Sequence, residues 1–530
     1  MSATLELANG LATCRFNGSF GLEEYQLFLK AKLLPERALD FDRMTGEYTI
    51  VTHERFAHIL GAALPERAEV KWTIAPHLFD YQAELVRHAI QARRFAFYWD
   101  CGMGKTPAEL EWCRIVQIIT GGKVLILCPL AVVGQTLREC SRFYDGKLEV
   151  LRLNTLQDLM AWLTDGAPGI AICNTEKMAA GIIPEFRNLS GIALDESSIL
   201  KGGGGVTKWN LIKSCRGITY KLSLTATPAP NDTMEFASQA GWLEKLRDES
   251  EILWTFFVRD DQGEWRVKPH SREAFYRFMA GWSVFLRDPR NYGFTDNLKA
   301  VPAPEFFDHK VEATPEQMAI VGDVLAATHQ GLLVEEAKLG VTARLRLSQA
   351  AKGFVYSKSE PPKAVPSLKP AEVARIVKEE YLAGRPVIVW TIFDEESRIL
   401  TDLLTEMGVP CASISGETKV SQREEIVAEF QAGKVPCLIT KASLLGFGVN
   451  LQTCAAMVFS GFDDSYERYY QAVRRAYRYG QERKVRVHTV WVPELEGMIL
   501  DNTNAKRVRF EADATEMERC YAKALREVLN

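Results

Sequence analysis

The chain has 530 residues, a formal net charge of −4 at pH 7 and an isoelectric point near 6.2. This length exceeds one ordinary hydrophobic core and predicts two to four domains, while the slightly acidic balance excludes a uniformly basic nucleic-acid-binding chain. Eleven cysteines without a Cys-x-x-Cys pair are typical of reduced, buried thiols of an intracellular protein and argue against a zinc site.

Membrane and secretion signals are absent from the parts of the sequence where they would stand. The N-terminal segment MSATLELANG lacks the basic and apolar blocks of a signal peptide. The longest apolar run, near 124–133, contains Pro129 and is too short to span a bilayer. We therefore expect a cytoplasmic protein without a membrane partner.

Residues 1–75 form a region of their own. Their pattern predicts a strand near 12–19, a helix near 23–33, two strands joined by a turn at Thr45-Gly46, and a further helix. This is a small α+β accessory domain. It would either guide a binding partner or act as a structural cap on the next domain, and the sequence leaves both alternatives open.

Two sets of short apolar runs follow, each separated by helical patterns. Such runs, bounded by turn residues, predict buried parallel strands and an α/β fold. We expect two doubly wound parallel-sheet domains, at 76–300 and 301–500, followed by a C-terminal helix within 501–530. The predicted strands are 95–99, 123–128, 169–173, 191–195 and 220–225 in the first domain, and 386–391, 411–415, 436–440, 456–460 and 484–492 in the second.

The segment YWDCGMGKT, at 98–106, follows a predicted strand and opens a helix, as a phosphate-binding loop does. Gly102-Met103-Gly104 would bring backbone N–H groups to the phosphates, Lys105 would neutralise them, and the Thr106 hydroxyl would ligate Mg²⁺. The first glycine of the Walker pattern is missing, because Trp99 stands in its place. The alternative is a chance GKT at a helix start.

Two further strand ends carry polar residues. In GIALDESS, Asp195 would hold the hydration shell of Mg²⁺ and Glu196 would orient the attacking water, unless the pair is only an acidic N-cap. In LSLTATPAPND, Thr225 and Thr227 would bridge the nucleotide site and a moving part, unless the segment is only a polar turn.

These segments, in this order, resemble the motifs of superfamily 2 helicases and specifically of the Swi/Snf-type DNA translocases, over roughly residues 76–495. LFDYQAELV is similar to the motif whose glutamine, here Gln82, reads adenine. The phosphate loop of that family also lacks the first Walker glycine, and Asn231 matches its L-T-x-T-P-x-x-N stretch. YYQAVRRAYRYGQ resembles its most specific signature, in which the matching residues are Gln471, Arg475, Arg478, Gly480 and Gln481.

The resemblance implies two RecA-like lobes that use ATP and Mg²⁺. Gln471 would contact the nucleotide, and Arg475 and Arg478, three residues apart on one predicted helix face, would act as arginine fingers. The alternative is a basic solvated face or a DNA contact. The chain departs from the family pattern at Ser198, which replaces a histidine, and in a longer loop around Gly448. The implied coupling residues are Ser198, Thr225, Thr227 and Gly448.

The resemblance also implies DNA as the track, with duplex favoured over single strands and little sequence preference. The implied backbone contacts are Pro129, Thr175, Thr391, Gly416, Thr440 and Asn450. We expect a monomeric motor of a bacterial or phage-infected cell. The alternatives are a fork-reversing or annealing helicase, the motor subunit of a restriction or phage-defence complex that needs a partner, or a DNA-binding scaffold without activity.

Overall fold

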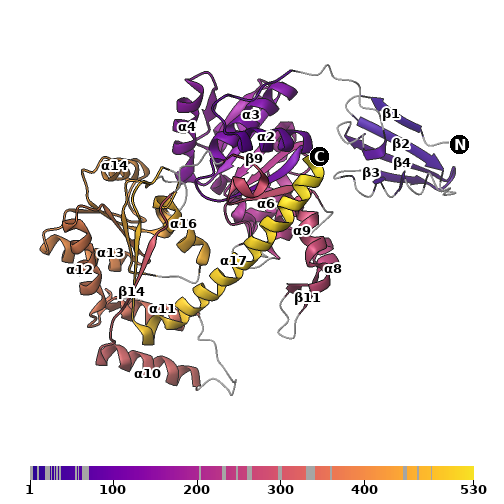
Figure 1. Cartoon of the computed structure of the whole chain (residues 1–530). Coiled ribbons are helices and arrows are strands. Elements are labelled where there is room, and N and C mark those ends of the chain that lie inside the picture. Colours follow the sequence, from indigo (N-terminus) through magenta and orange to yellow (C-terminus); the bar gives the residue numbers. More distant parts are fainter. Residues whose placement is uncertain are drawn as a thin grey trace. The chain divides into compact units, whose positions relative to one another are not determined.

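The computed structural model describes the chain from residue 71 to 529 with short gaps, and parts of the first 70 residues (Figure 1). The chain divides into two compact units, of which the first comprises residues 1–100, 104–295 and 518–530, and the second comprises 101–103 and 296–517. The described ranges are 4–8, 11–17, 38–53, 71–201, 205–229, 234–245, 249–259, 265–295, 301–329, 341–357, 361–445, 451–461, 465–478 and 480–529, with isolated positions between 24 and 61.

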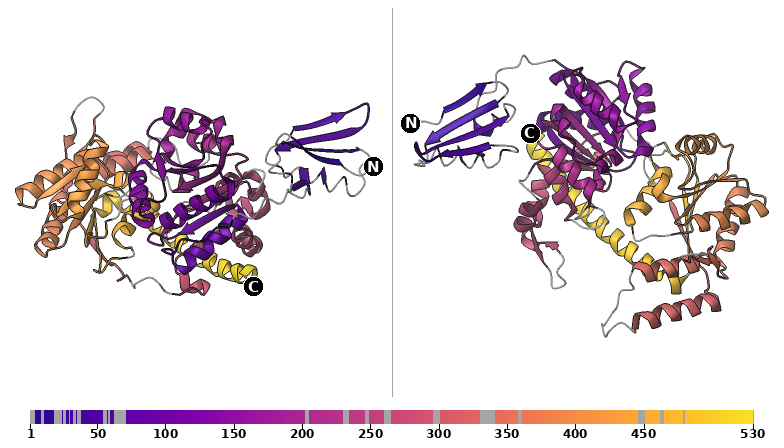
Figure 2. Two further views of the ribbon diagram at one scale, coloured as in Figure 1. Left: turned by 90° about the horizontal axis from the view of Figure 1, so that it is seen from above. Right: turned by 180° about the vertical axis from the view of Figure 1, so that it is seen from behind.

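The N-terminal region holds a four-stranded antiparallel sheet in the order β1-β2-β4-β3, which Figure 2 shows from two further sides. The predicted turn joins β3 to β4, with Gly46 at φ +68 and its N–H donating to the carbonyl of Asp42 at 2.8 Å. The sequence patterns missed the first strand, so the region has one strand more than predicted. Its strands are β1 (Thr4–Ala8), β2 (Leu11–Asn17), β3 (Ala38–Asp42) and β4 (Glu47–His53).

The first unit is built on a seven-stranded sheet in the order β13-β5-β10-β9-β6-β8-β7, in which every pairing is parallel. All five predicted strands are present, and the sheet adds β7 and β13 at its edges. The strands are β5 (Arg94–Trp99), β6 (Lys123–Cys128), β7 (Val150–Arg152), β8 (Gly169–Asn174), β9 (Leu189–Asp195), β10 (Tyr220–Leu224) and β13 (Ser283–Leu286).

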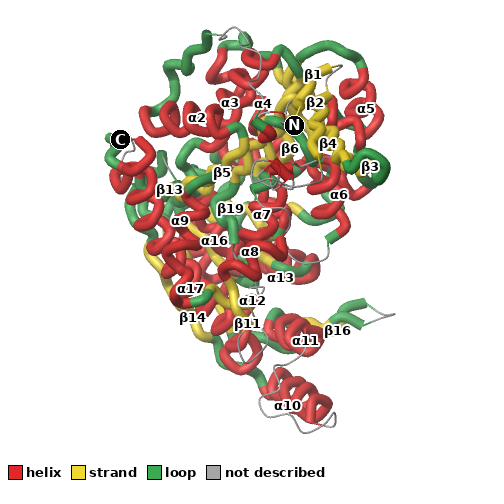
Figure 3. Tube along the Cα trace, turned by 90° about the vertical axis from the view of Figure 1, so that its right-hand side faces the viewer, coloured by secondary structure: helices red, strands yellow, loops and turns green. Residues whose placement is uncertain are grey.

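Helices follow most of these strands, as a doubly wound sheet requires, and Figure 3 shows the strands of this unit among them. The interior strand β6 is buried at all six positions, so helices cover both of its faces. The helices are α2 (Asp80–Ala92), α3 (Lys105–Thr120), α4 (Leu130–Tyr144), α5 (Leu156–Thr164), α6 (Val206–Ser214), α7 (Glu235–Trp242), α8 (Glu249–Phe256) and α9 (Arg272–Ala280), with short 3₁₀ turns such as η2 (Thr175–Ala180) and η4 (Ser197–Leu200). A small hairpin of β11 (Phe257–Arg259) and β12 (Trp265–Val267) follows α8.

The second unit carries a six-stranded sheet in the order β14-β21-β20-β17-β19-β18, again with every pairing parallel. The five predicted strands are present, and β14 adds an edge that the sequence pattern did not reveal. The strands are β14 (Glu305–Lys310), β17 (Val387–Thr391), β18 (Cys411–Ile414), β19 (Cys437–Lys441), β20 (Ala456–Phe459) and β21 (Arg486–Trp491). The prediction of two RecA-like α/β lobes, preceded in the sequence by a small N-terminal α+β region, is confirmed.

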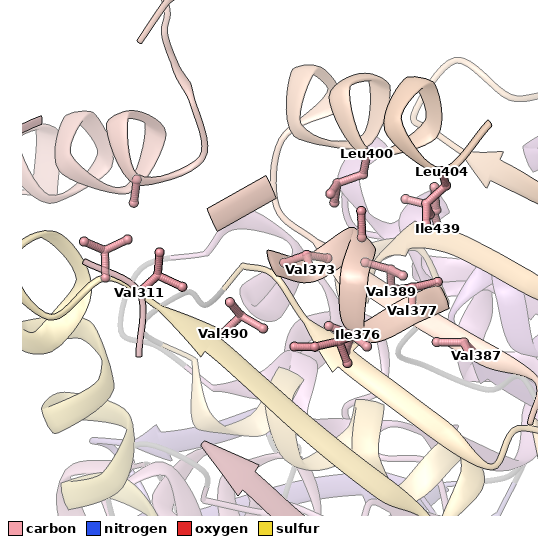
Figure 4. Close-up of a cluster of buried hydrophobic side chains, with 14 of the residues drawn as sticks. Val311, Val373, Ile376, Val377, Val387, Val389, Leu400, Leu404, Ile439 and Val490 are labelled. Carbon is pink, nitrogen blue, oxygen red and sulfur yellow. The ribbon is translucent and has the colours of Figure 1, made fainter. Parts of the chain in front are cut away.

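The core of the second unit lies between this sheet and its helices (Figure 4). Val387 and Val389 of β17 are fully buried against Val377 of α12 and Leu404 of α13. The helices of the unit are α10 (Pro315–His329), α11 (Val341–Ala351), α12 (Lys369–Leu382), α13 (Asp394–Glu406), α14 (Val420–Gln431), α15 (Ala442–Leu445), α16 (Tyr466–Ala476) and most of α17 (Pro493–Leu529), and β15 (Phe354–Val355) pairs with β16 (Lys363–Ala364).

The end of α17 belongs to the first unit. Tyr521 is fully buried and shares a hydrogen bond with the Ser283 hydroxyl on β13 at 2.5 Å, while the Glu518 carboxylate accepts from the N–H of Arg287 at 3.3 Å. Among the described residues, no helix is long and apolar enough to cross a membrane. All cysteines carry free thiols, and all except Cys411 are buried.

Candidate nucleotide-binding site

The predicted phosphate loop connects β5 to α3 in the first sheet. Gly102 and Gly104 have φ values of +86 and +71, the left-handed region that glycine adopts without strain. Trp99, at the position of the missing Walker glycine, is the last residue of β5 and is fully buried, stacked on Phe97 with ring centroids 4.3 Å apart. The loop therefore begins after residue 99, so a glycine at that position is not needed.

Gln82 lies directly against this loop. Its side-chain nitrogen donates to the carbonyl of Gly104 at 3.5 Å, and its side-chain oxygen accepts from the N–H of Phe79 at 3.0 Å. Gln82 is 3% exposed and stands on the first turn of α2. The structure thus brings together two segments that the sequence separates by more than twenty residues.

Gly104 cannot be replaced without moving Gln82. A Cβ at this position would lie 2.1 Å from the Gln82 side-chain nitrogen, and the left-handed backbone adds about 1–2 kcal/mol of strain for any other residue. We expect Gly104→Ala to weaken ATP binding roughly tenfold or more, measured by calorimetric titration with a non-hydrolysable analogue.

Gly121 is the matched control, because it ends the same helix at φ +62 and its Cβ would meet nothing within 4 Å. Gly121→Ala should lower stability by a similar backbone cost and leave the affinity unchanged. Equal affinities of the Gly104→Ala variant and the parent protein would contradict the role of this loop.

Lys105 and Thr106 open α3. The Lys105 ammonium donates to the carbonyl of Trp99 at 2.9 Å and to that of Asp100 at 3.5 Å, so the side chain folds back across the loop. Both residues are half-buried in the first turn of the helix. Backbone N–H groups and the helix dipole favour an anion at this end of α3.

The predicted carboxylate pair stands at the end of β9, two strands from β5 in the same sheet. Asp195 is 7% exposed and Glu196 8%, and a carboxylate oxygen of Asp195 accepts from the N–H of Glu196 at 2.9 Å. Glu196 has the left-handed backbone angles φ +52 and ψ +51, which cost a non-glycine residue about 1–3 kcal/mol and persist only where the surroundings hold them.

The residues present fit a nucleotide with Mg²⁺. Gly104 leaves room where a Cβ would collide with Gln82. One hydroxyl and one carboxylate, from Thr106 and Asp195, are oxygen ligands of the kind that Mg²⁺ takes alongside phosphates and water. The described residues contain no group of three or more acidic, histidine or cysteine side chains that could hold a metal ion by themselves.

One buried acid of this region escaped the sequence interpretation. Glu109 lies one turn beyond Lys105 on α3, is fully buried, and neither of its carboxyl oxygens has a hydrogen-bond partner in the described part of the chain. Burial raises the pKa of Glu109 well above its ordinary value, and the nearby Asp195 and Glu139 raise it further.

The raised pKa of Glu109 predicts a specific pH dependence of stability. The folded state holds this proton more tightly than the unfolded state, so the stabilising contribution is complete below the unfolded pKa of 4.5 and is lost as pH rises towards the folded value. We expect Glu109→Gln to flatten the decline in unfolding free energy between pH 5 and 8, by up to about 1.4 kcal/mol per pH unit. Urea unfolding at several pH values measures this, and parallel curves for the two proteins would contradict it.

Two of the predicted coupling residues, Thr225 and Thr227, follow β10, the strand that pairs with β9 up to Asp195. Thr225 and Thr227 are fully buried, and the Thr225 hydroxyl accepts from the N–H of Thr227 at 3.1 Å. The hydrogen bonds that link the strand ends run through Ser197 and Ser223, which the sequence did not single out, while the neighbouring Ser198 is buried and its carbonyl accepts from the N–H of Lys201. Gly448, Asn231 and Asn450 lie outside the described residues.

In the second unit, Gln471 and Arg475 stand one turn apart on α16. The Arg475 guanidinium donates to the side-chain oxygen of Gln471 at 3.0 Å, and both side chains are buried. The expectation that Arg475 and Arg478 share a helix face is wrong, because α16 ends at Ala476 and Arg478 follows two residues later. Tyr477 has φ −79 and ψ +79, which breaks the helical path between the two arginines.

Gly480 and Gln481 of the same signature support the backbone. Gln481 donates through its side-chain nitrogen to the carbonyls of Gln452 at 2.9 Å and Cys454 at 3.0 Å. Gly480 has φ +90, and a Cβ there would lie 2.9 Å from the side chain of Gln452. These two residues fix the segment that carries Arg478.

The predicted nucleic-acid contacts stand at or just beyond carboxyl ends of strands. Pro129 precedes α4 after β6, and Thr175 begins η2 after β8. In the second unit, Thr391 ends β17, Thr440 lies near the end of β19, and Gly416 follows β18. The three threonines are buried, each at most 3% exposed.

Comparison with known proteins agrees with these motifs. Residues 369–480 match the helicase conserved C-terminal domain. The chain is 30% identical over 421 residues to the putative ATP-dependent helicase/translocase YwqA of Bacillus subtilis, which covers 73% of this chain and 43% of that protein. It is 27% identical over 135 residues to the transcription regulatory protein SNF2 of Saccharomyces cerevisiae, covering 25% of this chain and 8% of that protein.

The chain therefore spans less than half the length of these curated relatives. Among solved structures, the Sulfolobus solfataricus SWI2/SNF2 ATPase core in complex with dsDNA aligns with 84% of this chain and 96% of its own, at 18% identity and a TM-score of 0.39. In its ordered motifs, its two all-parallel sheets and these sequence matches, the chain is similar to the Swi/Snf-type ATPases of helicase superfamily 2.

Proposed function

We propose that the chain is a nucleic-acid-dependent ATPase that couples ATP hydrolysis to movement along duplex DNA. The observation that carries this proposal is the first unit's site: a loop with two left-handed glycines, Gln82 against it, and the carboxylate pair Asp195 and Glu196 at the edge of the same sheet. The name of the relative YwqA, a putative ATP-dependent helicase/translocase, agrees with it.

In this proposal each residue has a defined task. Gln82 contacts the adenine, the N–H groups around Gly104 receive the phosphates, and Lys105 moves from its loop carbonyls to neutralise their charge. Thr106 and Asp195 hold Mg²⁺, which offsets the negative charge of the phosphates when it is bound. Glu196 orients the attacking water.

The second lobe contributes the arginines. We propose that Arg475 and Arg478 stabilise the charge that develops on the phosphates during hydrolysis. Arg475 is buried and hydrogen-bonded to Gln471, so we propose that it mainly holds the segment in place. We propose that Arg478 is the arginine that contacts the phosphates. Closure and release of the lobes during the ATP cycle would then move the chain along DNA.

The proposed track is the DNA backbone. Contacts from Pro129, Thr175, Thr391, Gly416, Thr440 and Asn450 would carry no sequence information, so binding should be insensitive to sequence and should weaken steeply with salt. The slightly acidic chain has no global attraction for DNA, so this grip must come from local surfaces.

The test is the ATPase rate of the purified chain alone and with duplex DNA, single-stranded DNA or RNA, together with displacement of a third strand from a triplex as a measure of movement. We expect the greatest stimulation by duplex DNA. Equal stimulation by RNA would overturn the DNA assignment. Absence of activity with every nucleic acid would favour a motor subunit that needs a partner protein.

The arginine proposal has its own variant. Arg478→Ala should lower kcat by about 10³-fold or more while ATP still binds, since the guanidinium acts on charge that develops only during the reaction. Arg483→Ala is the matched control, because Arg483 is exposed. The hydrogen bond that it makes in the described part of the chain comes from its backbone N–H, which donates to the side-chain oxygen of Gln481 at 2.9 Å and is kept in the variant. Equal kcat values for the two variants would contradict an arginine finger at position 478.

A further inference from the structure

Three buried polar side chains of the first unit form a closed group of hydrogen bonds. The Ser223 hydroxyl lies 2.7 Å from the Ser197 hydroxyl and 2.8 Å from the side-chain oxygen of Gln239. The side-chain nitrogen of Gln239 donates to the carbonyl of Ser197 at 2.8 Å. Ser197 and Ser223 are fully buried and Gln239 is 1% exposed. A buried amide is held in one orientation when both of its ends are satisfied in this way.

The group joins three elements that surround the carboxylate pair. Ser197 follows Glu196 directly and begins η4, and Ser223 is the penultimate residue of β10, two positions before Thr225. Gln239 lies in the middle of α7, a helix whose residues are almost all buried. The neighbouring Ser238 points to a different element, since it accepts from the Lys208 ammonium on α6 at 2.8 Å.

Because this group lies next to Glu196, it helps to hold the backbone of that residue in place. Glu196 keeps a left-handed backbone that its own side chain does not favour, so contacts on both sides of the residue must hold it. On one side, Asp195 accepts from the N–H of Glu196; on the other, Gln239 holds the carbonyl of the next residue. The orientation of the Glu196 side chain thus depends on the position of α7.

We propose that Gln239 is a positioning residue for ATP hydrolysis, which holds the Glu196 turn through Ser197 and so ties the rate of hydrolysis to α7. The inference rests on the proposed roles of Asp195 and Glu196. It predicts that loss of the amide lowers kcat while nucleotide binding, which uses the phosphate loop, stays intact. A displacement of about 1 Å at a catalytic group can lower a rate by roughly 10²-fold.

Two variants of Gln239 separate positioning from packing. Gln239→Leu keeps the approximate volume and removes both hydrogen bonds, and should lower kcat roughly 10- to 100-fold with an unchanged KM for ATP. In Gln239→Glu, an ionised carboxylate cannot donate to the Ser197 carbonyl, whereas the protonated acid can donate there and still accept from Ser223. The ratio of its kcat to that of the parent should therefore rise as pH falls from 8 to 6.

The parent protein measured at each pH corrects for other titrating groups. The charged residues on α7 itself and on the elements around it are the same in both proteins: Asp195, Glu196, Lys208, Lys213, Lys221, Glu235, Glu249 and Glu251. Ser238→Ala is the matched control, because it removes a buried hydrogen bond from the same helix without touching Ser197. Its kcat should stay within about twofold of the parent value, whatever its stability.

The outcomes distinguish this inference from the proposed function. If Glu196→Gln abolishes hydrolysis but Gln239→Leu does not change kcat, or if Ser238→Ala lowers kcat as much and no pH rescue occurs, Gln239 is only structural and the inference is wrong. If Glu196→Gln retains full activity, the proposed role of Glu196 fails first. If the parent protein hydrolyses no ATP with any nucleic acid, both fail together.

Discussion

Replacing Lys105 with alanine is expected to lower kcat/KM for ATP by at least about 10²–10³-fold, with no measurable loss of stability. The ammonium is the cation that the phosphate loop supplies, and its removal leaves the phosphates opposed only by backbone dipoles. Within the described part of the chain it donates only to the carbonyls of Trp99 and Asp100, which remain close to the helix start. The fold therefore does not depend on this side chain.

The measurement is a steady-state ATPase assay with saturating duplex DNA, accompanied by thermal unfolding. Lys147→Ala is the matched control, because Lys147 is exposed on the same unit and lies outside the proposed site. Comparable rates for the two variants would show that phosphate binding occurs elsewhere. A large fall in the unfolding temperature of the Lys105→Ala variant would show that the loop has a structural role that we do not assign to it.

Replacing Glu496 with alanine is expected to destabilise the second unit by about 3–5 kcal/mol. Glu496 is 1% exposed at the start of α17 and accepts from two buried ammonium groups, at 2.6 Å from Lys352 and at 2.6 and 2.8 Å from Lys369. Its carboxylate also accepts from the N–H of Val492 at 3.1 Å. Without this carboxylate, two ammonium groups stay buried with no counter-ion. An uncompensated buried charge is strongly destabilising.

The pH dependence of this effect follows from the pKa shifts. Burial alone would raise the pKa of Glu496, but the attraction of Lys352 and Lys369 and their hydrogen bonds leave it below its ordinary value. The contribution of Glu496 is therefore complete above the unfolded pKa of 4.5 and is lost as pH falls through the lower folded value. Burial lowers the pKa of Lys369 to about 8, although Glu496 raises it in part.

In the Glu496→Ala variant Lys369 loses the attraction of that carboxylate, so its pKa should fall further below 8. The folded state then binds fewer protons than the unfolded state, and the stability of the variant should recover as pH rises from 7 to 9.5. Hydrogen exchange of β17 and β21 amides measures the local loss, with β5 and β9 of the other unit unchanged. Glu494→Ala is the control, since Glu494 is exposed on the same helical turn. Equal exchange rates in the two variants would contradict the ion-pair argument.

Ten of the thirteen strands in the two parallel sheets were predictable, because a buried parallel strand is a short apolar run between turn residues. The three that were missed, β7, β13 and β14, lie at sheet edges. In β14, half-buried positions alternate with exposed ones. In β13, Ser283 is hydrogen-bonded to Tyr521, which lies more than two hundred residues away in the sequence. The local pattern of an edge strand cannot report such distant contacts.

The sequence by itself determined the phosphate loop, the Asp195-Glu196 strand end and the arginine signature, because each is a contiguous segment whose chemistry needs fixed residue types at fixed spacing. Tertiary structure alone decided that Glu109 is buried with no hydrogen-bond partner among the described residues, and that Arg478 lies beyond the end of α16. It also decided that Gln239 reaches back 42 residues to the Ser197 carbonyl. The physical reason is that burial and hydrogen-bond partners depend on which strands and helices become neighbours, and sheet order brings together segments that no local pattern connects.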